Sequence, residues 1–146
     1  MALVELRGIR HRYANRVVLD LEQFSVPRTG ALVVVGHNGS GKSTLLRLLA
    51  LLEAPTEGQV WFDGKLLPRR APATVRRRVT LVEQRPVLFR GTVRENLEFG
   101  LRVRDVSPTA AAGIIGHVVE QLGLQSLVER PPHDLSLGGV HRGARA

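Results

Sequence analysis

The sequence of 146 residues contains no cysteine and only two lysines, Lys42 and Lys65. Because it has no thiol, the chain can form neither disulfide bonds nor thiolate zinc clusters, and a cysteine nucleophile is excluded, while the redox compartment stays open. No apolar run approaches the roughly 18 residues that a membrane-spanning helix requires. The first residues show no basic leader followed by an apolar run. We therefore expect a cytosolic chain.

Aromatic residues are also scarce, at 4% of the chain, whereas 43% of the residues are hydrophobic and 23% are charged. These fractions are typical of a globular protein, and a chain of about 150 residues can bury roughly two-thirds of its unfolded surface as one domain. The net charge of +8 is almost wholly due to arginine. It has three explanations: a solvated arginine surface, an anionic ligand or membrane surface, and nucleic acid. The basic residues have no interleaved aromatics, so we expect no nucleic-acid partner.

Short strands are predicted in the first half of the chain. Residues 4–12 and 17–24 flank a turn and predict a hairpin. The compact apolar run at residues 31–35 ends at a glycine and is typical of a strand buried on both faces. Further strands are expected at residues 59–62 and 79–82. Hairpins and a strand, loop and helix unit together predict an α/β fold.

Helices are predicted after the glycine-rich turn and again in the second half of the chain. Thr92 and Glu95 form a capping-box pair at the start of one helix, and Ser107 suits the N-cap of another. A turn of helix at residues 126–129 is expected to complete a helical hairpin. The helix expected over residues 42–52 has a broad apolar face made of Leu45, Leu46, Leu48, Leu49 and Leu52.

Residues 36–43 match the pattern G-x-x-x-x-G-K-[ST], and Thr44 extends the match. The glycines permit backbone conformations in which successive amides point at phosphate oxygens, and the helix N-terminus adds partial positive charge. We expect Lys42 to neutralise the β- and γ-phosphates and Ser43 to ligate magnesium. The predicted nucleotide-binding residues of the loop are Gly36, His37, Asn38, Gly39, Ser40, Gly41, Lys42, Ser43 and Thr44.

The alternative for this loop is a glycine-rich turn that contains a lysine by chance. The loop follows an apolar strand and opens an amphipathic helix, which is the setting that the motif requires, so we favour nucleotide binding. The motif alone does not identify the reaction, because kinases, GTPases and transport ATPases share it.

The loop and its continuation, Gly-His-Asn-Gly-Ser-Gly-Lys-Ser-Thr-Leu-Leu, resemble the ATP-binding subunits of ABC transporters. Residues 56–60 and 62–64 are similar to the strand and turn that follow the loop helix in that family. The resemblance implies that Tyr13 stacks on adenine, with an ordinary strand tyrosine as the alternative. It also implies ATP and Mg²⁺ as cofactors.

Gln84 lies where the family has a glutamine that contacts magnesium and the attacking water. The resemblance makes Gln84 a predicted catalytic and metal-contacting residue, with a solvated glutamine as the alternative. Residues 86–97 resemble the segment that touches the membrane permease, and their continuation to residue 102 is similar to importers of oxyanions such as tungstate, molybdate or phosphate. The resemblance therefore implies a permease partner through residues 86–102, and it disfavours a small P-loop kinase or a nucleic-acid ATPase.

The family's Leu-Ser-Gly-Gly-Gln signature, whose amides bind the γ-phosphate held by the opposite subunit, is matched imperfectly. The signature-like residues are Ser136, Gly138 and Gly139, but Leu137 separates the serine from the glycines and Val140 stands where a polar residue is expected. The chain ends soon afterwards. We expect a frameshift or truncation, with a genuine variant signature as the alternative.

No apolar strand ending in Asp-Glu follows, so the aspartate that holds magnesium and the glutamate that orients water in the family have no counterpart. Since these groups act mainly on turnover, we expect little or no ATP hydrolysis by this chain alone. The resemblance implies that two further strands are also lacking, which in the family lie between the strand at residues 31–35 and the strand at residues 79–82. Their absence is expected to leave backbone groups and apolar faces uncovered.

The sequence therefore predicts a P-loop NTPase core with an N-terminal antiparallel β-subdomain and the start of an α-helical subdomain, incomplete at the C-terminus. The expected divisions are residues 1–85, 86–134 and 135–146. The implied function is the ATP-binding component of an ABC importer, homodimeric and peripheral on the cytoplasmic face of the membrane. A truncated or frameshifted, non-catalytic remnant with at most weak nucleotide binding is the alternative.

Overall fold

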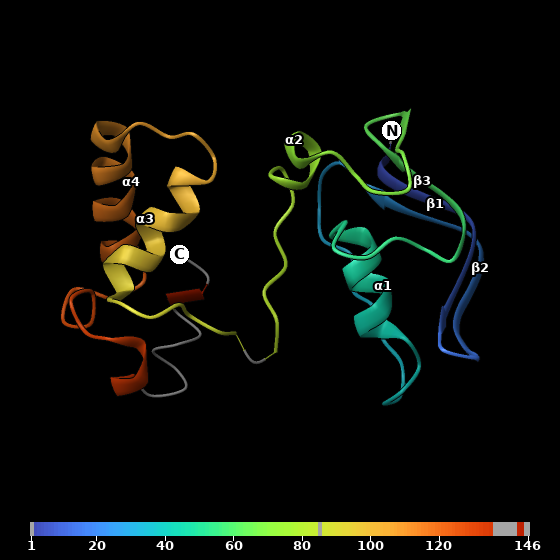
Figure 1. The fold of residues 1–146 in the computed structure, drawn as a ribbon, viewed down its shortest axis with the longest axis horizontal. Helices are drawn as coiled ribbons and strands as arrows, with labels where there is room; N and C mark the ends of the chain where they lie inside the picture. Colours follow the sequence, from blue (N-terminus) through green and yellow to red (C-terminus); the bar gives the residue numbers. More distant parts are fainter. Residues whose placement is uncertain (1, 85, 136–142, 145–146) are drawn as a thin grey trace. The chain divides into compact units, whose positions relative to one another are not determined.

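The computed structural model describes residues 2–84, 86–135 and 143–144 (Figure 1). The chain forms two compact units, Met1–Leu81 and Val82–Ala146. The first, unit 1, contains the β-sheet and the glycine-rich loop, and the second, unit 2, is helical. None of the helices in the described ranges is long and apolar enough to cross a membrane.

Unit 1 is built on an antiparallel sheet with the strand order β2-β1-β3-β4. Strands β1 (Ala2–Tyr13) and β2 (Arg16–Pro27) form the predicted hairpin, and both are longer than expected. Strand β3 (Glu57–Phe62) confirms the strand expected at residues 59–62, and a tight turn leads into β4 (Lys65–Leu66). The alternating apolar pattern of β1 therefore places one face of the sheet toward the core.

A bulge in β1 adjusts which residues of that strand reach the core. Gly8 has φ 58°, and the pairing of β1 with β3 shifts register around it. A Cβ on Gly58 would lie 2.3 Å from the Gly8 carbonyl oxygen, so the two backbones approach too closely for a side chain. Leu6 and Ile9 are three positions apart, yet both are fully buried. The extra residue of the bulge turns the Ile9 side chain to the same face of the sheet as Leu6.

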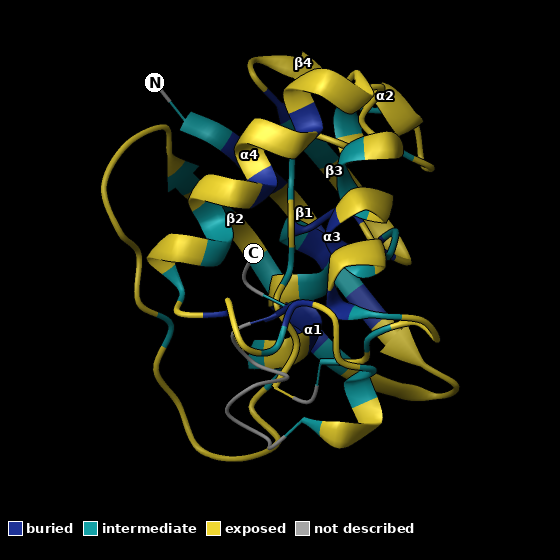
Figure 2. Ribbon diagram, turned by 90° about the vertical axis from the view of Figure 1, so that its left-hand side faces the viewer, coloured by how far each residue is buried: buried dark blue, intermediate teal, exposed yellow. Residues whose placement is uncertain are grey.

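Helix α1 (Lys42–Leu49) packs on the core face of this sheet. Leu45 and Leu48 are buried in the same hydrophobic cluster as residues of β1. Figure 2 colours the buried positions of the ribbon dark blue. Leu46 and Leu52 are 42% and 59% exposed. The predicted helix at residues 42–52 therefore forms but ends at Leu49, before Leu51 takes a positive φ of 59°. The expected apolar face is only partly buried, because the sheet covers one side of α1 in the described residues.

Two predicted strands do not form. Residues 31–35 and 79–82 have no regular secondary structure, and Val33 and Val35 are 79% and 85% exposed. A strand needs a neighbour to accept and donate its ladder hydrogen bonds, and no described segment pairs with either of these. Only Val34 and Val79 contact the core of unit 1 from these runs. A short helix, α2 (Ala73–Arg76), precedes the second run.

Unit 2 contains helices α3 (Val93–Arg102) and α4 (Pro108–Gln121) and a short 3-10 helix, η1 (Pro132–Asp134). The capping box is confirmed: the Glu95 amide donates to Thr92 Oγ1, and the Thr92 amide donates to the Glu95 carboxylate at 2.6 Å. Ser107 caps α4, also as predicted. Val93, Leu97 and Ile115 form the buried contact between the two helices.

The expected helix at residues 126–129 is a series of turns instead. Gly123 has φ 62° and ends α4. The Leu127 amide then donates to the Leu124 carbonyl at 2.8 Å, a three-residue spacing that buries Leu124 and Val128 without a full helical turn.

Candidate functional site: the phosphate loop

Residues 36–41 form an exposed loop that leads directly into α1. Gly39 and Gly41 have φ values of 83° and 89°, which side-chain-bearing residues rarely adopt. A Cβ on Gly41 would also lie 2.7 Å from the Val18 carbonyl oxygen of β2. The end of the loop is therefore seated against the sheet in a conformation that requires glycine.

Lys42 folds back over this loop. Its Nζ donates hydrogen bonds to the carbonyl oxygens of Gly36 at 2.7 Å and His37 at 2.8 Å. The Ser40 amide donates to the same His37 carbonyl at 3.3 Å. The loop thus curls around the ammonium group, and a positive charge lies within the curve.

The N-terminus of α1 has backbone donors that no side chain satisfies. The first amides of any helix have no carbonyl partner within the helix. Gly41 is the N-cap of α1 and offers no capping side chain, and the first turn holds no acidic residue. Ser43 is exposed, whereas Thr44 is buried. The amides of residues 42–44 are left as donors at the positive end of the helix dipole.

This arrangement fits the phosphates of a nucleotide. Free amides at a helix N-terminus, an ammonium group and glycines that allow close approach are the elements of a phosphate cradle. The exposed Ser43 hydroxyl is the loop group that would ligate Mg²⁺. Within the described residues, no group of three or more His, Cys, Asp or Glu side chains could hold a metal by itself.

Tyr13, at the end of β1, has a hydrogen-bonded hydroxyl group and a partly exposed ring. The hydroxyl donates to Glu53 at 2.5 Å, and the ring meets the His11 ring edge to face at 5.0 Å. The side chain is 43% exposed. His11 is buried, and its Nε2 lies 3.4 Å from Glu53 without the alignment of a hydrogen bond.

The contacts of Glu53 and His11 were not predicted. His11 falls on the inward face of β1, and a polar residue at such a position was the available signal. Glu53 follows α1 by a few residues and had no sequence signal of its own. It also lies 3.6 Å from Arg47, so one carboxylate joins β1 and α1.

The predicted permease segment begins without regular secondary structure, and Asn96 joins it to α3. The Phe89 amide donates to Asn96 Oδ1 at 2.7 Å, and Asn96 Nδ2 donates to the carbonyls of Phe89 and Thr92. Phe89 is 63% exposed and Val87 is 86% exposed. The role of Asn96 was also not predicted, although an asparagine one turn into a helix can bond backward to the preceding chain.

Gln84 lies at the start of unit 2 in an exposed position without regular structure. The loop residues and Tyr13 belong to unit 1, so the shared magnesium role of Ser43 and Gln84 stays a prediction. Ser136, Gly138 and Gly139 lie outside the described residues.

Comparison with known proteins decides the family. A family model described as ABC transporter matches residues 19–144, which is most of the chain. The chain belongs to the ABC transporter family. Its relatives place it with the ATP-binding domains of that family.

Two curated relatives are similar over nearly the whole chain. The sn-glycerol-3-phosphate import ATP-binding protein UgpC of Bartonella quintana is 37% identical over 97% of this chain and 41% of its own length. The energy-coupling factor transporter ATP-binding protein EcfA1 of Bacillus licheniformis is 38% identical over 99% of this chain and 53% of its own length. The chain thus spans about half the length of these relatives.

The ABC fold is also shown by solved structures. That of cbiO1 from Clostridium perfringens, described as part of the ABC transporter complex cbiONQ, aligns with a TM-score of 0.81 and 23% identity. The alignment covers 99% of this chain and 59% of that one. The predicted fold class, an ABC-type core with an N-terminal antiparallel sheet and a helical part, is confirmed.

Proposed function

We propose that this chain binds ATP with Mg²⁺ at residues 36–44 and serves as the ATP-binding component of an ABC importer. The observation that carries the proposal is the uncapped N-terminus of α1 with the Lys42 ammonium held inside the loop. An anion placed there would meet amides and a cation that no side-chain acceptor among the described residues neutralises.

Each residue of the site has a proposed role. The amides of residues 39–44 would hold the phosphates, and Lys42 would exchange its carbonyl contacts for phosphate oxygens. Ser43 would ligate Mg²⁺. The exposed ring of Tyr13 would stack on the base, with its hydroxyl held by Glu53. Gln84 would contact the metal and the attacking water, as the resemblance implies.

The remaining parts of the proposal concern the assembly. We propose a permease contact through residues 86–102, a second nucleotide-binding subunit, and a cytoplasmic, membrane-peripheral location. The exposed Val87 and Phe89 support the permease contact, and the relatives' names support import. We propose an oxyanion as the solute, on the sequence similarity of residues 86–102. Little or no hydrolysis by this chain alone stays a prediction.

The decisive experiment is titration calorimetry of the 146-residue chain with Mg-ATP. Lys42→Ala is expected to weaken binding by roughly 10- to 100-fold, since a hydrogen-bonded charge contributes on the order of 1.5–3 kcal/mol. Lys65→Ala is the matched control, because Lys65 is the only other lysine and lies exposed in β4. It is expected to leave the affinity unchanged.

Two results would contradict the proposal. If a folded chain does not bind Mg-ATP, the loop is not a nucleotide site. If Lys42→Ala and Lys65→Ala weaken binding equally, the attraction is due to general charge and not to the loop. Circular dichroism of each variant separates both results from a loss of fold.

A further inference from the structure

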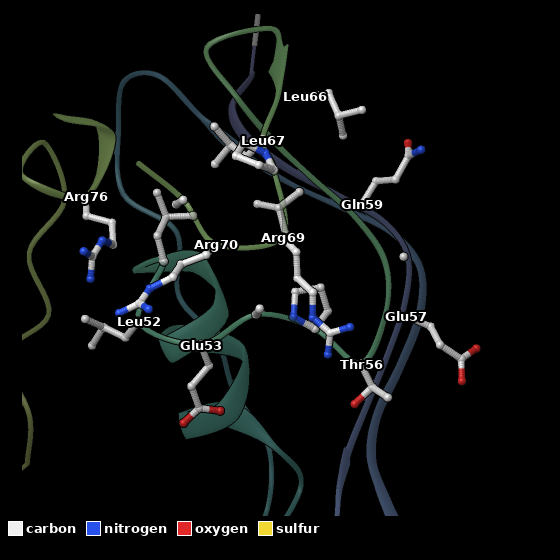
Figure 3. Close-up of a pocket in the computed structure, with 17 residues that line it drawn as sticks. Leu52, Glu53, Thr56, Glu57, Gln59, Leu66, Leu67, Arg69, Arg70 and Arg76 are labelled. Atoms are coloured by element: carbon white, nitrogen blue, oxygen red, sulfur yellow. The ribbon is translucent and has the colours of Figure 1, made fainter. Parts of the chain in front are cut away.

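A pocket of about 410 Å³ lies in unit 1, between the segment that follows α1 and the chain around β4 (Figure 3). Thr56 and three arginines, Arg69, Arg70 and Arg76, are among its lining residues. We call it the arginine pocket. None of residues 36–44 lines it, so it is separate from the phosphate loop.

The arginines of this pocket differ from most other arginines of unit 1. The guanidinium groups of Arg69, Arg70 and Arg76 make no hydrogen bond or ion pair with any described residue, and in unit 1 only that of Arg16 shares this state. Arginines of unit 1 that do pair with a carboxylate include Arg7 with Glu5, Arg10 with Asp20, Arg12 with Glu57, Arg28 and Arg78 with Asp63, and Arg47 with Glu53.

The two acidic residues in the lining do not neutralise the pocket. Glu53 accepts a hydrogen bond from Tyr13 and lies 3.6 Å from Arg47. Glu57 lies 3.9 Å from Arg12. Both carboxylates are therefore engaged with residues outside the pocket, and the cationic groups are left without an internal counter-charge.

Figure 3 shows how the three guanidinium groups are placed. Arg70 and Arg76 extend to the same side of the pocket, near Leu52, whereas Arg69 extends toward Thr56. Like charges gathered in one concavity repel one another and attract anions. A guanidinium group is a planar fork that binds a phosphate or carboxylate group by two parallel hydrogen bonds.

We propose that the arginine pocket binds a small soluble anion with a phosphate-type group, independently of the nucleotide site. A phosphate-type group offers several oxygens and more than one negative charge, so it can serve two guanidinium groups at once. A monovalent anion offers less charge to two cations. Inorganic pyrophosphate is a suitable probe because it has no base or sugar.

The test uses the full chain carrying Lys42→Ala, so that the phosphate loop is weakened and the pocket is intact. Calorimetry with pyrophosphate at low salt is expected to show binding. Adding Arg70→Gln and Arg76→Gln together is expected to weaken it by roughly tenfold or more, since two charge-assisted contacts to the anion are lost. Arg16→Gln is the matched control, because it removes an equally unpaired charge outside the pocket, and no change is expected.

Three outcomes would overturn the proposal: no pyrophosphate binding to the Lys42→Ala chain, less than a twofold effect of the double substitution, or an equal effect of Arg16→Gln. If the doubly substituted chain fails to fold, amide chemical shifts of the Lys42→Ala chain decide. Pyrophosphate is then expected to shift residues 51–60 and 66–76, and shifts confined to other residues would refute the site.

Discussion

The N-termini of α1 and α3 satisfy the same backbone requirement in opposite ways. At α3, Thr92 and Glu95 bond reciprocally to each other's amides, and the Val93 and Arg94 amides donate to the carbonyls of Arg130 and Val128, so the chain itself satisfies this helix end. At α1, the N-cap is Gly41 and no side chain takes its place. Both helices begin with amides that lack helical partners, but only α1 leaves them to a partner from outside the chain.

This difference separates a helix end built for stability from one available for binding. A capping box contributes to the stability of its own helix, whereas an uncapped end with a nearby ammonium group gives up that contribution and retains affinity for anions. Substitutions at the two ends should therefore have separate consequences. Those at α1 should affect ligand binding, and those at α3 only stability.

The largest effect is expected from Gly41→Ala. The residue has φ 89°, and the new Cβ would lie 2.7 Å from the Val18 carbonyl oxygen. The left-handed conformation alone costs a non-glycine residue about 1–2 kcal/mol. We therefore expect the free energy of unfolding to fall by about 2 kcal/mol or more, and Mg-ATP binding to be lost. Urea unfolding followed by Trp61 fluorescence measures the change in stability, because Trp61 is the only tryptophan.

Gly113→Ala is the matched control for that substitution. Gly113 lies within α4, and a Cβ there meets nothing within 4 Å. Alanine is expected to stabilise α4 by about 0.5–1 kcal/mol, with no change in Mg-ATP affinity. Equal effects at both glycines would mean that the loop conformation has no special role.

A smaller effect is expected from Thr92→Ala, which removes the α3 cap. The loss should be about 1 kcal/mol, visible in the helical circular dichroism signal during urea unfolding, with Mg-ATP affinity unchanged. Thr109→Ala, near the start of α4, serves as the control. If removal of the capping box also lowered the affinity for ATP, the α3 N-terminus would not serve stability alone, and the contrast with α1 would be wrong.

The smallest effect is expected at Asp63, whose carboxylate pairs with two arginines of the chain, Arg28 and Arg78. A hydrogen bond from Arg28 lowers the pKa of the Asp63 carboxyl, and the nearby charge of Arg78 adds to this. Because the folded-state pKa lies below the ordinary value of about 3.9, the stabilisation is present above that pH and is lost as pH falls through the folded pKa.

Comparing unfolding of the unsubstituted chain and Asp63→Asn between pH 7 and pH 3 measures this contribution. The gap in stability should be small, because these groups are exposed, and it should shrink with added salt. If the difference in stability between the two chains grew as the pH fell, the pKa of Asp63 would not be lowered in the folded state.

Local signals in the sequence predicted local features well. The turn residues predicted the hairpin and the β3–β4 turn, and Thr92, Glu95 and Ser107 predicted two helix starts, because each of these depends on contacts a few residues apart. The apolar runs at residues 31–35 and 79–82 predicted strands that did not form. A strand depends on its neighbours, which the composition of a run does not show. Only the family resemblance indicated that two neighbouring strands are lacking.

By itself, the sequence determined the phosphate loop, because glycine spacing, a lysine and a following helix act over fewer than ten or so residues. Tertiary structure alone decided what Glu53 binds, how Gly8 and Gly58 bring Leu6 and Ile9 to one face, and which arginines lack a counter-charge. These features join residues far apart in the chain, and their energies depend on distance in space, which no local pattern encodes.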